Sequence, residues 1–367
     1  GAAVDADAAA SLAYLAHFGP RAIAAVSFAL TSVAVSDVVV DVGAGSGASA
    51  LALVAAGAKR VVLVESSKRA LEVAKRLLAG VVEVECVLAD AAGARAKSAN
   101  GAGLVLSAFS FAEMTSSLRA AMAARTVESI ERRDAHRGQS PRRDARGNQN
   151  VGGEPVSEAD ADVDADADED VARTAARQAF AQIEAVAPKA ATLVVVDAGD
   201  RERARRLQAL RDDLVDEGRA ILAPCPHRDP CPALVRERDW CHQRVAKDLP
   251  EELARFARAV GRDDERMALS HLVIARKSGG DGAAPRDDHV LAIGDPLVEK
   301  GRARLPVCGP GGLRFVQALK RHREAYDALV SIERGTRLRG SLAALAKNAA
   351  GDTAVVDDPA AIATLLP

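Results

Sequence analysis

Short runs of hydrophobic residues, separated by polar and glycine-containing segments, dominate the first third of the chain. They consist mostly of Val and Leu and cover residues 38–42, 60–65, 82–90 and 103–110, with a fifth run at 191–199. Continuous apolar runs of this length are typical of strands that are buried on both faces. Helical patterns alternate with them, as at 68–78, so the sequence predicts an α/β fold with a parallel sheet between helices.

The remaining periodic segments predict further helices and some later strands. Residues 8–31 are rich in apolar side chains but are interrupted by Gly19 and Pro20, which predicts two helices joined by a turn. Helical patterns also occupy 171–186 and 201–219, and strands are expected at 268–277 and 302–312. Residues 335–367 show little periodicity and are expected to form a weakly ordered tail.

One segment between the fourth and fifth runs has almost no large apolar side chains. Residues 131–170 are rich first in Arg, then in Gly and Asn, and finally in acids. Such a composition cannot bury enough surface to order itself, so it predicts a flexible insertion in a loop. Its acidic end, residues 154–170, holds nine acids and no base, so it masks the net positive charge of the other residues. The other residues, 49 basic and 42 acidic, carry +7, although the whole chain carries −2.

Composition narrows the class of protein. The 367 residues are 49% hydrophobic and 27% charged, and no apolar run reaches the roughly 18 residues that span a membrane. Five cysteines in so long a chain do not form a disulfide scaffold, which favours a reducing interior, cytosolic or mitochondrial. Arginines cluster at 201–206 and 236–244, a pattern compatible both with solvated helix faces and with nucleic-acid contacts.

The turn after the first strand carries the sequence DVGAGSG, in which Asp41 precedes Gly43, Gly45 and Gly47. Glycines let a ligand approach the backbone closely, and the N-terminus of the following helix offers free N–H groups. The pattern D-x-G-x-G-x-G differs from the dinucleotide pattern G-x-G-x-x-G. Two acids extend this candidate cofactor site. Glu65 ends the second strand, where it can accept hydrogen bonds from ribose hydroxyls.

Asp90 ends the third strand, within reach of an adenine amino group. Over residues 38–110 the chain resembles the S-adenosylmethionine-dependent methyltransferases of the Rossmann-like class, which implies that fold and makes S-adenosylmethionine the candidate cofactor. A nicotinamide-binding domain and a loop that binds nothing are the alternatives. The Asn/Asp-Pro-Pro-Tyr/Phe motif of many amine methyltransferases is replaced here by SAFSFAEM, so the catalytic residues are unknown. Glu113 in this stretch is interpreted as an exposed glutamate at a helix start.

Three of the five cysteines lie in one stretch, APCPHRDPCPALVRERDWCH (223–242), which also holds two histidines and the only tryptophan. A fourth cysteine stands in a strand-to-turn context far along the chain, so the candidate metal ligands are Cys225, Cys231, Cys241 and Cys308. Thiolates at such loop spacings suit tetrahedral zinc or an iron–sulfur cluster. The short two-residue spacings of zinc ribbons are absent, which favours the cluster modestly. Cys86, within an apolar strand pattern, is expected to be an ordinary core residue.

PCPH, CP and DWCH occur in this order after the glycine loop, and LSHLVIARK and LPVCGPGG follow them. With AYLAHFGPRAIAAVSFAL before the first strand, the chain resembles the mitochondrial methyltransferase-like protein seventeen family over most of 11–335. That family includes the yeast mitoribosomal small-subunit protein twenty-two and bacterial relatives. The resemblance implies a protein of the mitochondrial matrix, without a membrane anchor, that assembles or resides on the small ribosomal subunit.

The resemblance further implies contact with small-subunit rRNA and ribosomal proteins, and a [4Fe–4S] cluster on Cys225, Cys231, Cys241 and Cys308, with zinc as the alternative. His227 and His242 would then shape the loop rather than bind metal. The alternative function is an active S-adenosylmethionine-dependent rRNA methyltransferase. The family usually has Glu-Pro-Gly-Thr after the fifth strand, where this chain has Asp197-Ala198-Gly199-Asp200. That difference argues against methyl transfer.

The expected architecture is therefore a Rossmann-like class I methyltransferase fold of class α/β, with N-terminal helices and an inserted cysteine-rich metal-binding subdomain. The expected divisions are an N-terminal helical segment at 1–34, the methyltransferase-like domain at 35–219, the cysteine-rich subdomain at 220–312 and a C-terminal basic segment and tail at 313–367.

Overall fold

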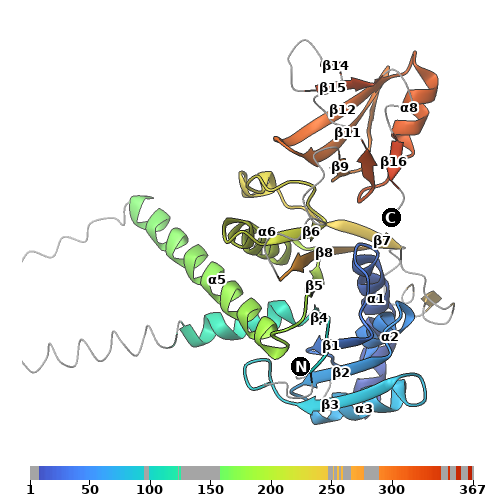
Figure 1. Cartoon of the computed structure of the whole chain (residues 1–367). Helices are drawn as coiled ribbons and strands as arrows, with labels where there is room; N and C mark the ends of the chain where they lie inside the picture. The colour runs from blue at the N-terminus through green and yellow to red at the C-terminus, as the bar shows by residue number, and fades with distance from the viewer. Residues whose placement is uncertain are drawn as a thin grey trace, which may run out of the picture.

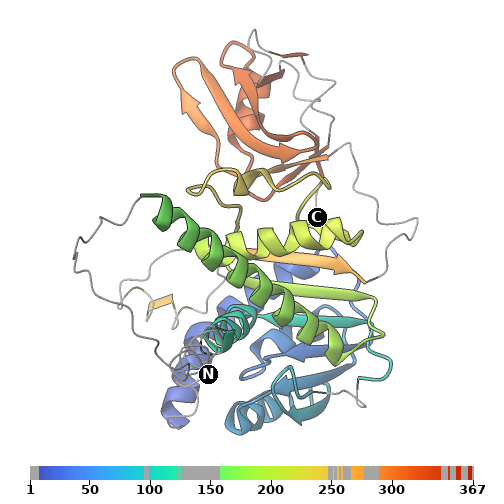
Figure 2. The same ribbon diagram turned by 90° about the vertical axis from the view of Figure 1, so that its left-hand side faces the viewer.

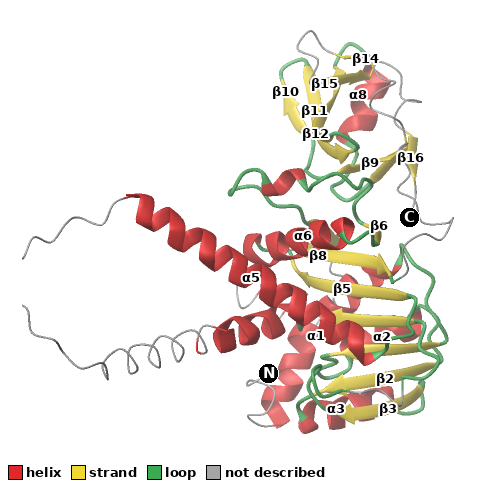
Figure 3. Ribbon diagram, turned by 60° about the vertical axis from the view of Figure 1, so that its left-hand side comes forward, coloured by secondary structure: helices red, strands yellow, loops and turns green. Residues whose placement is uncertain are grey.

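The structure is a computed structural model that describes residues 8–94, 99–122, 124, 158–246, 251, 254–255, 258, 266–276, 289–339, 346–347, 353–356 and 363–365. Its described strands form two sheets, one near each end of the molecule (Figure 1). The N-terminal sheet is covered by helices on both faces, and the C-terminal sheet packs against one short helix. The cysteine-rich loop lies between the two bodies (Figure 3).

The first sheet has the strand order β3-β2-β1-β4-β5-β8-β6. Its parallel strands are β1 (Val38–Val42), β2 (Arg60–Glu65), β3 (Glu83–Leu88), β4 (Leu104–Ala108) and β5 (Thr192–Ala198). All five of the strands expected between residues 38 and 199 are therefore present. The long strand β8 (Arg266–Ala275) runs antiparallel to β5, and both β6 (Ala220–Ala223) and β7 (Gln243–Ala246) pair with β8.

Alternation along the strands sends side chains into two separate cores. Val40 and Val42 pack in the core under α5 (Glu158–Val186) and α6 (Arg201–Asp216), together with Phe180 and Leu210. Val39 packs in the opposite core under α1 (Ala8–Leu30), α2 (Ala48–Ala55) and α3 (Lys68–Leu78). Figure 2 shows α5 and α6 crossing one face of the sheet. A sheet covered in this way explains why its strands are continuous apolar runs.

The predicted pair of N-terminal helices is wrong, because residues 8–30 form the single helix α1 with Pro20 inside it. Proline removes one backbone donor and disfavours the preceding turn, but it does not prevent a helix whose face is held by tertiary contacts. Ala25, Val26 and Ala29 are fully buried against the sheet, and α1 packs along α2. The helix is thus part of the first domain rather than a separate segment at 1–34.

The expected flexible insertion at 131–170 is also revised at its C-terminal end. Helix α5 begins at Glu158, so residues 158–170 are helical, whereas 131–157 lie outside the described residues. Alanine has the highest helix propensity, and acidic residues are favourable near a helix N-terminus because they complement its dipole. An alternating Ala/Asp run at the start of a packed helix can therefore extend it, although the run has no apolar face of its own.

The second sheet was not expected. Its strand order is β14-β15-β12-β11-β9-β13-β16, with β10 paired to β11. The strands are β9 (His289–Ala292), β10 (Leu297–Glu299), β11 (Arg302–Gly309), β12 (Gly312–Leu319), β13 (Arg337–Arg339), β14 (Ala346–Lys347), β15 (Thr353–Val356) and β16 (Ala363–Leu365), and helix α8 (Arg323–Val330) packs on β11 and β12.

This sheet changes the expected domain boundaries. The predicted subdomain at 220–312 is divided, because β6, β7 and β8 complete the first sheet whereas β9, β10 and β11 belong to the second. The predicted tail contributes β13 to β16 to the second sheet. Leu305, Val307 and Leu329 form a separate core there. The hairpin of β11 and β12 is local, but β9, β13, β15 and β16 have only three or four residues and pair with strands far away in sequence. Local patterning does not reveal such short strands.

The expectation that Cys86 is a core residue is wrong. It lies on β3, the edge strand of the first sheet, and its side chain is exposed. The strand pattern VEVECVLAD is therefore that of a half-exposed edge strand. No helix among the described residues combines the length and apolar character needed to cross a membrane.

Candidate metal centre and cofactor loop

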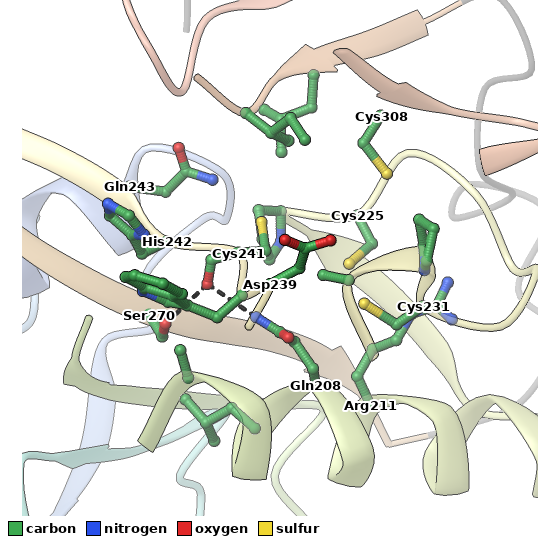
Figure 4. A pocket seen from close by; sticks show the side chains of 18 of the residues that line it. Gln208, Arg211, Cys225, Cys231, Asp239, Cys241, His242, Gln243, Ser270 and Cys308 are labelled. Carbon is green, nitrogen blue, oxygen red and sulfur yellow. Dashed lines mark hydrogen bonds between the residues drawn. The ribbon is translucent and has the colours of Figure 1, made fainter. Parts of the chain in front are cut away.

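The structure brings the four predicted metal ligands to one place. Cys225, Cys231 and Cys241 lie on the loop between β6 and β7, which includes the short 3-10 helix η1 (Pro232–Leu234). Cys308 comes from β11 in the second sheet. All four cysteines line a single cavity of about 300 Å³ (Figure 4). The cavity therefore sits where the loop of the first domain meets the second sheet.

Burial makes these thiols hard to ionise in the absence of a cation. It raises the pKa of Cys231 to about 12, and the neighbouring Cys225 sulfur acts in the same direction. Burial likewise raises the pKa of Cys241 and of Cys308, with further increases from the other cysteines of the group. Burial also raises the pKa of Cys225, but the Arg211 guanidinium opposes that increase. A metal or cluster that binds thiolates here would have to release protons.

One face of helix α6 holds the backbone of the cysteine loop. Arg205 Nη1 donates to three loop carbonyls, those of Ala233 (3.1 Å), Arg236 (2.9 Å) and Asp239 (3.0 Å). One turn further on, Gln208 Nε2 donates to the Cys241 carbonyl at 2.8 Å. Residues three and four apart share a helix face, so one side of α6 contacts most of the loop.

The next turn of α6 fixes the loop around Cys231. The Asp212 carboxylate accepts a hydrogen bond from the Cys231 N–H at 2.8 Å. Arg211, fully buried, donates to the carbonyls of His227 and Asp229. The prediction from sequence missed this function of α6, because its polar residues looked like an ordinary solvated or basic face. Arg205 in particular is tied to the loop rather than free for a nucleic acid.

The two histidines of the motif differ in position. His227 is buried, and its Nε2 lies 3.1 Å from the Cys308 Sγ. His242 stacks on Trp240 and contacts Arg334 Nη1, which lies 3.0 Å from its Nε2. Burial lowers the pKa of both rings, to about 4 for His242, where the positive charges of Arg334 and Arg244 lower it further. Both rings are therefore neutral near pH 7.

The glycine loop forms at the carboxyl edge of β1, as the sequence predicts. Gly43, Gly45 and Gly47 all have positive φ, and α2 begins at Ala48 directly after them. A Cβ on Gly43 would come within 2.3 Å of the Ser110 Cβ, whereas a Cβ on Gly45 would meet no atom within 4 Å. Gly43 is therefore required by packing, and Gly45 borders open space at which a ligand could approach.

The acids at this edge have unequal surroundings. Asp41 is fully buried and accepts a hydrogen bond from Ser49 Oγ at 2.5 Å, and burial raises its pKa to about 7. Glu65 accepts from the N–H groups of Gly45 and Ser67, each at 2.9 Å. These two predicted cofactor residues thus stand beside the loop.

Asp90, by contrast, is exposed and accepts a hydrogen bond from the Gly93 N–H at 2.6 Å. Its carboxylate is engaged with its own turn, so the structure gives no contact between Asp90 and the glycine loop.

Two features near the ends of β4 and β5 were not predicted from the sequence. Phe109 has φ 61°, and non-glycine residues held in this region cluster at functional sites. Asp197 is buried and accepts hydrogen bonds from the N–H groups of Ala112 and Ala198, and burial raises its pKa to about 6. Only the acid at the end of a buried strand could have suggested Asp197. Glu113 is exposed, as expected.

The strand order and the glycine loop define the class of protein. Five parallel strands in the order 3-2-1-4-5, followed by an antiparallel strand, form a methyltransferase-like α/β domain, and residues 39–130 match a sequence family described as a methyltransferase domain. Residues 170–339, which include all four clustered cysteines, match the family described as mitochondrial small ribosomal subunit Rsm22. The resemblance to this family that the cysteine motif indicated is thus confirmed.

Solved structures with a similar chain course include magnesium protoporphyrin IX methyltransferase from Synechocystis PCC 6803 with bound S-adenosylmethionine. It is 12% identical, with a TM-score of 0.35, over 74% of this chain and 86% of the other. TrmK from M. capricolum, in complex with S-adenosylhomocysteine, is 9% identical, with a TM-score of 0.34, over 71% of this chain and 70% of the other. No curated protein matches the sequence.

Proposed function

We propose that this protein binds the rRNA of the mitochondrial small ribosomal subunit, during assembly or as a resident protein, and carries a [4Fe–4S] cluster on Cys225, Cys231, Cys241 and Cys308. The observation that carries the proposal is that three thiols from the loop between β6 and β7 and one from β11 of the second sheet line one cavity, within the residues that match the Rsm22 family. The description of that family as mitochondrial small ribosomal subunit supports a location in the mitochondrial matrix and a partnership with ribosomal proteins.

The donor set fits a cluster better than a single zinc ion. Cysteine thiolates are the usual ligands of four-iron clusters, and the four sulfurs are distributed around a cavity of about 300 Å³. Structural zinc instead needs its ligands to converge on one point at about 2.3 Å for each sulfur. The cavity leaves room for a group larger than one ion.

The protein would use the cluster as a structural joint. When bound, a cluster of this kind supplies iron–thiolate bonds that link the cysteine loop to β11. The loop is poor in large apolar side chains, and α6 provides the hydrogen bonds that keep its backbone in place. His227, beside Cys308, orients that ligand, as hydrogen-bonding neighbours of metal ligands commonly do.

Anaerobic purification of the full chain tests the cluster directly. We expect about four iron and four sulfide per chain, and a brown chromophore with absorbance near ~400 nm that is lost in air. A colourless protein with one bound zinc would refute the cluster assignment.

Association with the ribosome is tested by co-sedimentation with small ribosomal subunits and by crosslinking to rRNA. The first domain would provide a rigid platform, and its exposed arginines would neutralise phosphates. Protein that remains free of subunits and gives no RNA crosslinks would exclude this function.

An active S-adenosylmethionine-dependent rRNA methyltransferase is the second candidate. It is favoured by the loop at Gly43 to Gly47, by the open space beside Gly45 and by Glu65 at the adjacent strand end. Catalysis would then proceed mainly through proximity and orientation. Two experiments test whether the protein is an active methyltransferase. A calorimetric titration measures binding of S-adenosylmethionine, and the rRNA methylation map is compared between the wild type and Gly45→Arg. Absence of binding, or a map unchanged by the variant, would exclude methyl transfer.

A further inference from the structure

The single tryptophan of the chain is held in an unusual position. Trp240 lies on the cysteine loop, but its indole Nε1–H donates to the Gly199 carbonyl at 3.0 Å, just beyond the end of β5. Despite this anchor, 39% of the residue is exposed. A tryptophan that served only to pack the loop would be expected to be more deeply buried. The side chain is thus fixed in orientation and accessible to solvent.

One face of the indole is supported from behind. The ring of His242 stacks on it, with the ring centroids 5.7 Å apart and the planes inclined by 22°. His242 is in turn contacted by Arg334, from the turn between α8 and β13. An aromatic ring that is backed on one face and still exposed offers its other face to a planar ligand.

Four exposed arginines belong to the loop that carries Trp240 and to the start of α6. Arg236 and Arg238 lie exposed on the same loop, and Arg201 and Arg203 stand exposed at the start of α6, directly after the segment to which the indole is anchored. Three of these arginines pair with acids: Arg201 with Glu237 at 3.9 Å, Arg203 with Asp200 at 3.3 Å and Arg238 with Asp239 at 4.0 Å. Ion pairs of such exposed arginines are weak, so a phosphate can replace the carboxylate. Arg205 takes no part, because it is bound to the loop backbone.

We propose that Trp240 stacks on one unpaired nucleobase of a single-stranded RNA segment, while the surrounding arginines contact the adjacent phosphates. Sequence-tolerant recognition of unpaired nucleotides combines such aromatic faces with a positively charged surface. A duplex hides the faces of its bases, so it cannot use the ring. This inference rests on the proposed function and adds to it the class of RNA and the residue that binds it.

The anchor also determines which edge of the first domain the base would face. Gly199 follows β5, and the carboxyl ends of the parallel strands carry the glycine loop and Glu65 at the same edge. A base stacked on Trp240 would therefore lie on the cofactor side of the sheet. The same position serves an RNA platform and, in the second candidate function, an RNA substrate.

The test measures affinity for RNA and tryptophan emission on the full chain, purified anaerobically. Because Trp240 is the only tryptophan, its emission reports directly on stacking. We expect a short single-stranded oligoribonucleotide to quench that emission and a duplex of equal length to leave it nearly unchanged. Trp240→Ala should weaken single-strand binding roughly tenfold, and Trp240→Phe by only about two- to threefold. Val235→Ala, on the same loop and 81% exposed, is the matched control and should bind like the wild type.

The outcomes separate this inference from the function on which it rests. Unchanged emission at saturating single-stranded RNA, or equal affinities of the wild type and Trp240→Ala, would overturn stacking on Trp240 while RNA binding stands. Quenching of equal size by the duplex would overturn the preference for unpaired bases. No binding of any RNA by the wild type would refute the proposed function and this inference together. The emission of the wild type decides the question even if a variant fails to fold.

Discussion

The Nε2 atom of His227 lies 3.1 Å from the Sγ atom of Cys308, although the two residues are 81 positions apart in the chain. His227 belongs to the loop that follows β6 of the first sheet, and Cys308 belongs to β11 of the second. The contact joins two bodies that have separate hydrophobic cores. Polar contacts such as those of Arg244 with Asp295 (2.8 Å) cross the same boundary. The cysteine centre is thus placed at a joint between domains.

Replacement of Cys308 by Ser should prevent the iron–sulfur cluster from binding between the two domains. We expect loss of the absorbance near ~400 nm and faster amide hydrogen exchange in 223–242 and 289–339, while β1 to β5 keep their protection. Cys86→Ser is the control, because Cys86 is exposed on the edge strand β3 and should change neither iron content nor exchange. Global loss of protection in Cys308→Ser would show that the two bodies fold as one cooperative unit.

Replacement of Cys231 by Ser should act more locally. Cys231 is buried on the loop, and its N–H is bound by Asp212. We expect loss of the cluster and local unfolding of about residues 220–245, measured by limited proteolysis, with the far-ultraviolet circular dichroism of the first domain retained. Retention of full iron content in this variant would contradict the assignment of Cys231 as a ligand.

Arg205→Lys should weaken the hold of α6 on the loop. The guanidinium reaches the loop through two nitrogens, with Nη1 donating to the carbonyls of Ala233, Arg236 and Asp239 and Nη2 to that of Leu234. The single ammonium nitrogen of lysine cannot reproduce both sets of contacts. We expect a loss of about 1–3 kcal/mol in the free energy of unfolding, measured by chemical denaturation. Arg201→Lys, at an exposed pair of 3.9 Å, should change it by less than about 0.5 kcal/mol. Equal effects of the two variants would argue against a role of Arg205 in holding the loop.

The glycine loop offers a matched pair of substitutions. Gly43→Ala should destabilise the protein by about 3 kcal/mol, because the new Cβ would overlap the Ser110 Cβ and φ is positive. Gly45→Ala should cost only about 1 kcal/mol, because its Cβ would enter open space and only the backbone conformation is unfavourable. Thermal denaturation of both variants in the absence of cofactor checks the order, and the reverse order would contradict the described loop geometry.

Asp41 should make stability decrease as pH rises. Its pKa is raised by burial from 3.8 to about 7, so the folded state binds a proton more tightly than the unfolded state. Between about pH 4 and pH 7 the unfolded state has released this proton whereas the folded state still holds it. The free energy of unfolding therefore decreases as pH rises through this range, and the decrease is complete above about pH 7. Asp41→Asn should flatten the decrease of the unfolding free energy over that range, by on the order of 4 kcal/mol. An identical pH profile of variant and wild type would contradict the shift.

Local patterning was sufficient for the five parallel strands of the first domain because each of them is locally consistent. The strands β1, β2 and β4 are apolar runs buried on both faces, and α3 spans the residues 68–78 at which the helical pattern predicted it. Pro20 shows the limit of this reasoning, because the packing of α1 on the sheet overrides the local break. The second sheet as a whole escaped prediction because the strands that flank the local hairpin of β11 and β12 are short and pair over long distances.

The sequence by itself determined which atoms can do the chemistry: glycines that free the backbone, acids at strand ends, and four thiols suited to soft metals. Only the tertiary structure decided where they act. It placed Cys308 of β11 beside the loop that carries Cys225 and Cys231. It also engaged the Asp90 carboxylate in a hydrogen bond within its own turn and anchored Trp240 just beyond the end of β5. The physical reason is that thiolate, carboxylate and glycine chemistry is a property of each residue, whereas contacts between distant segments depend on how two separate cores fold and meet.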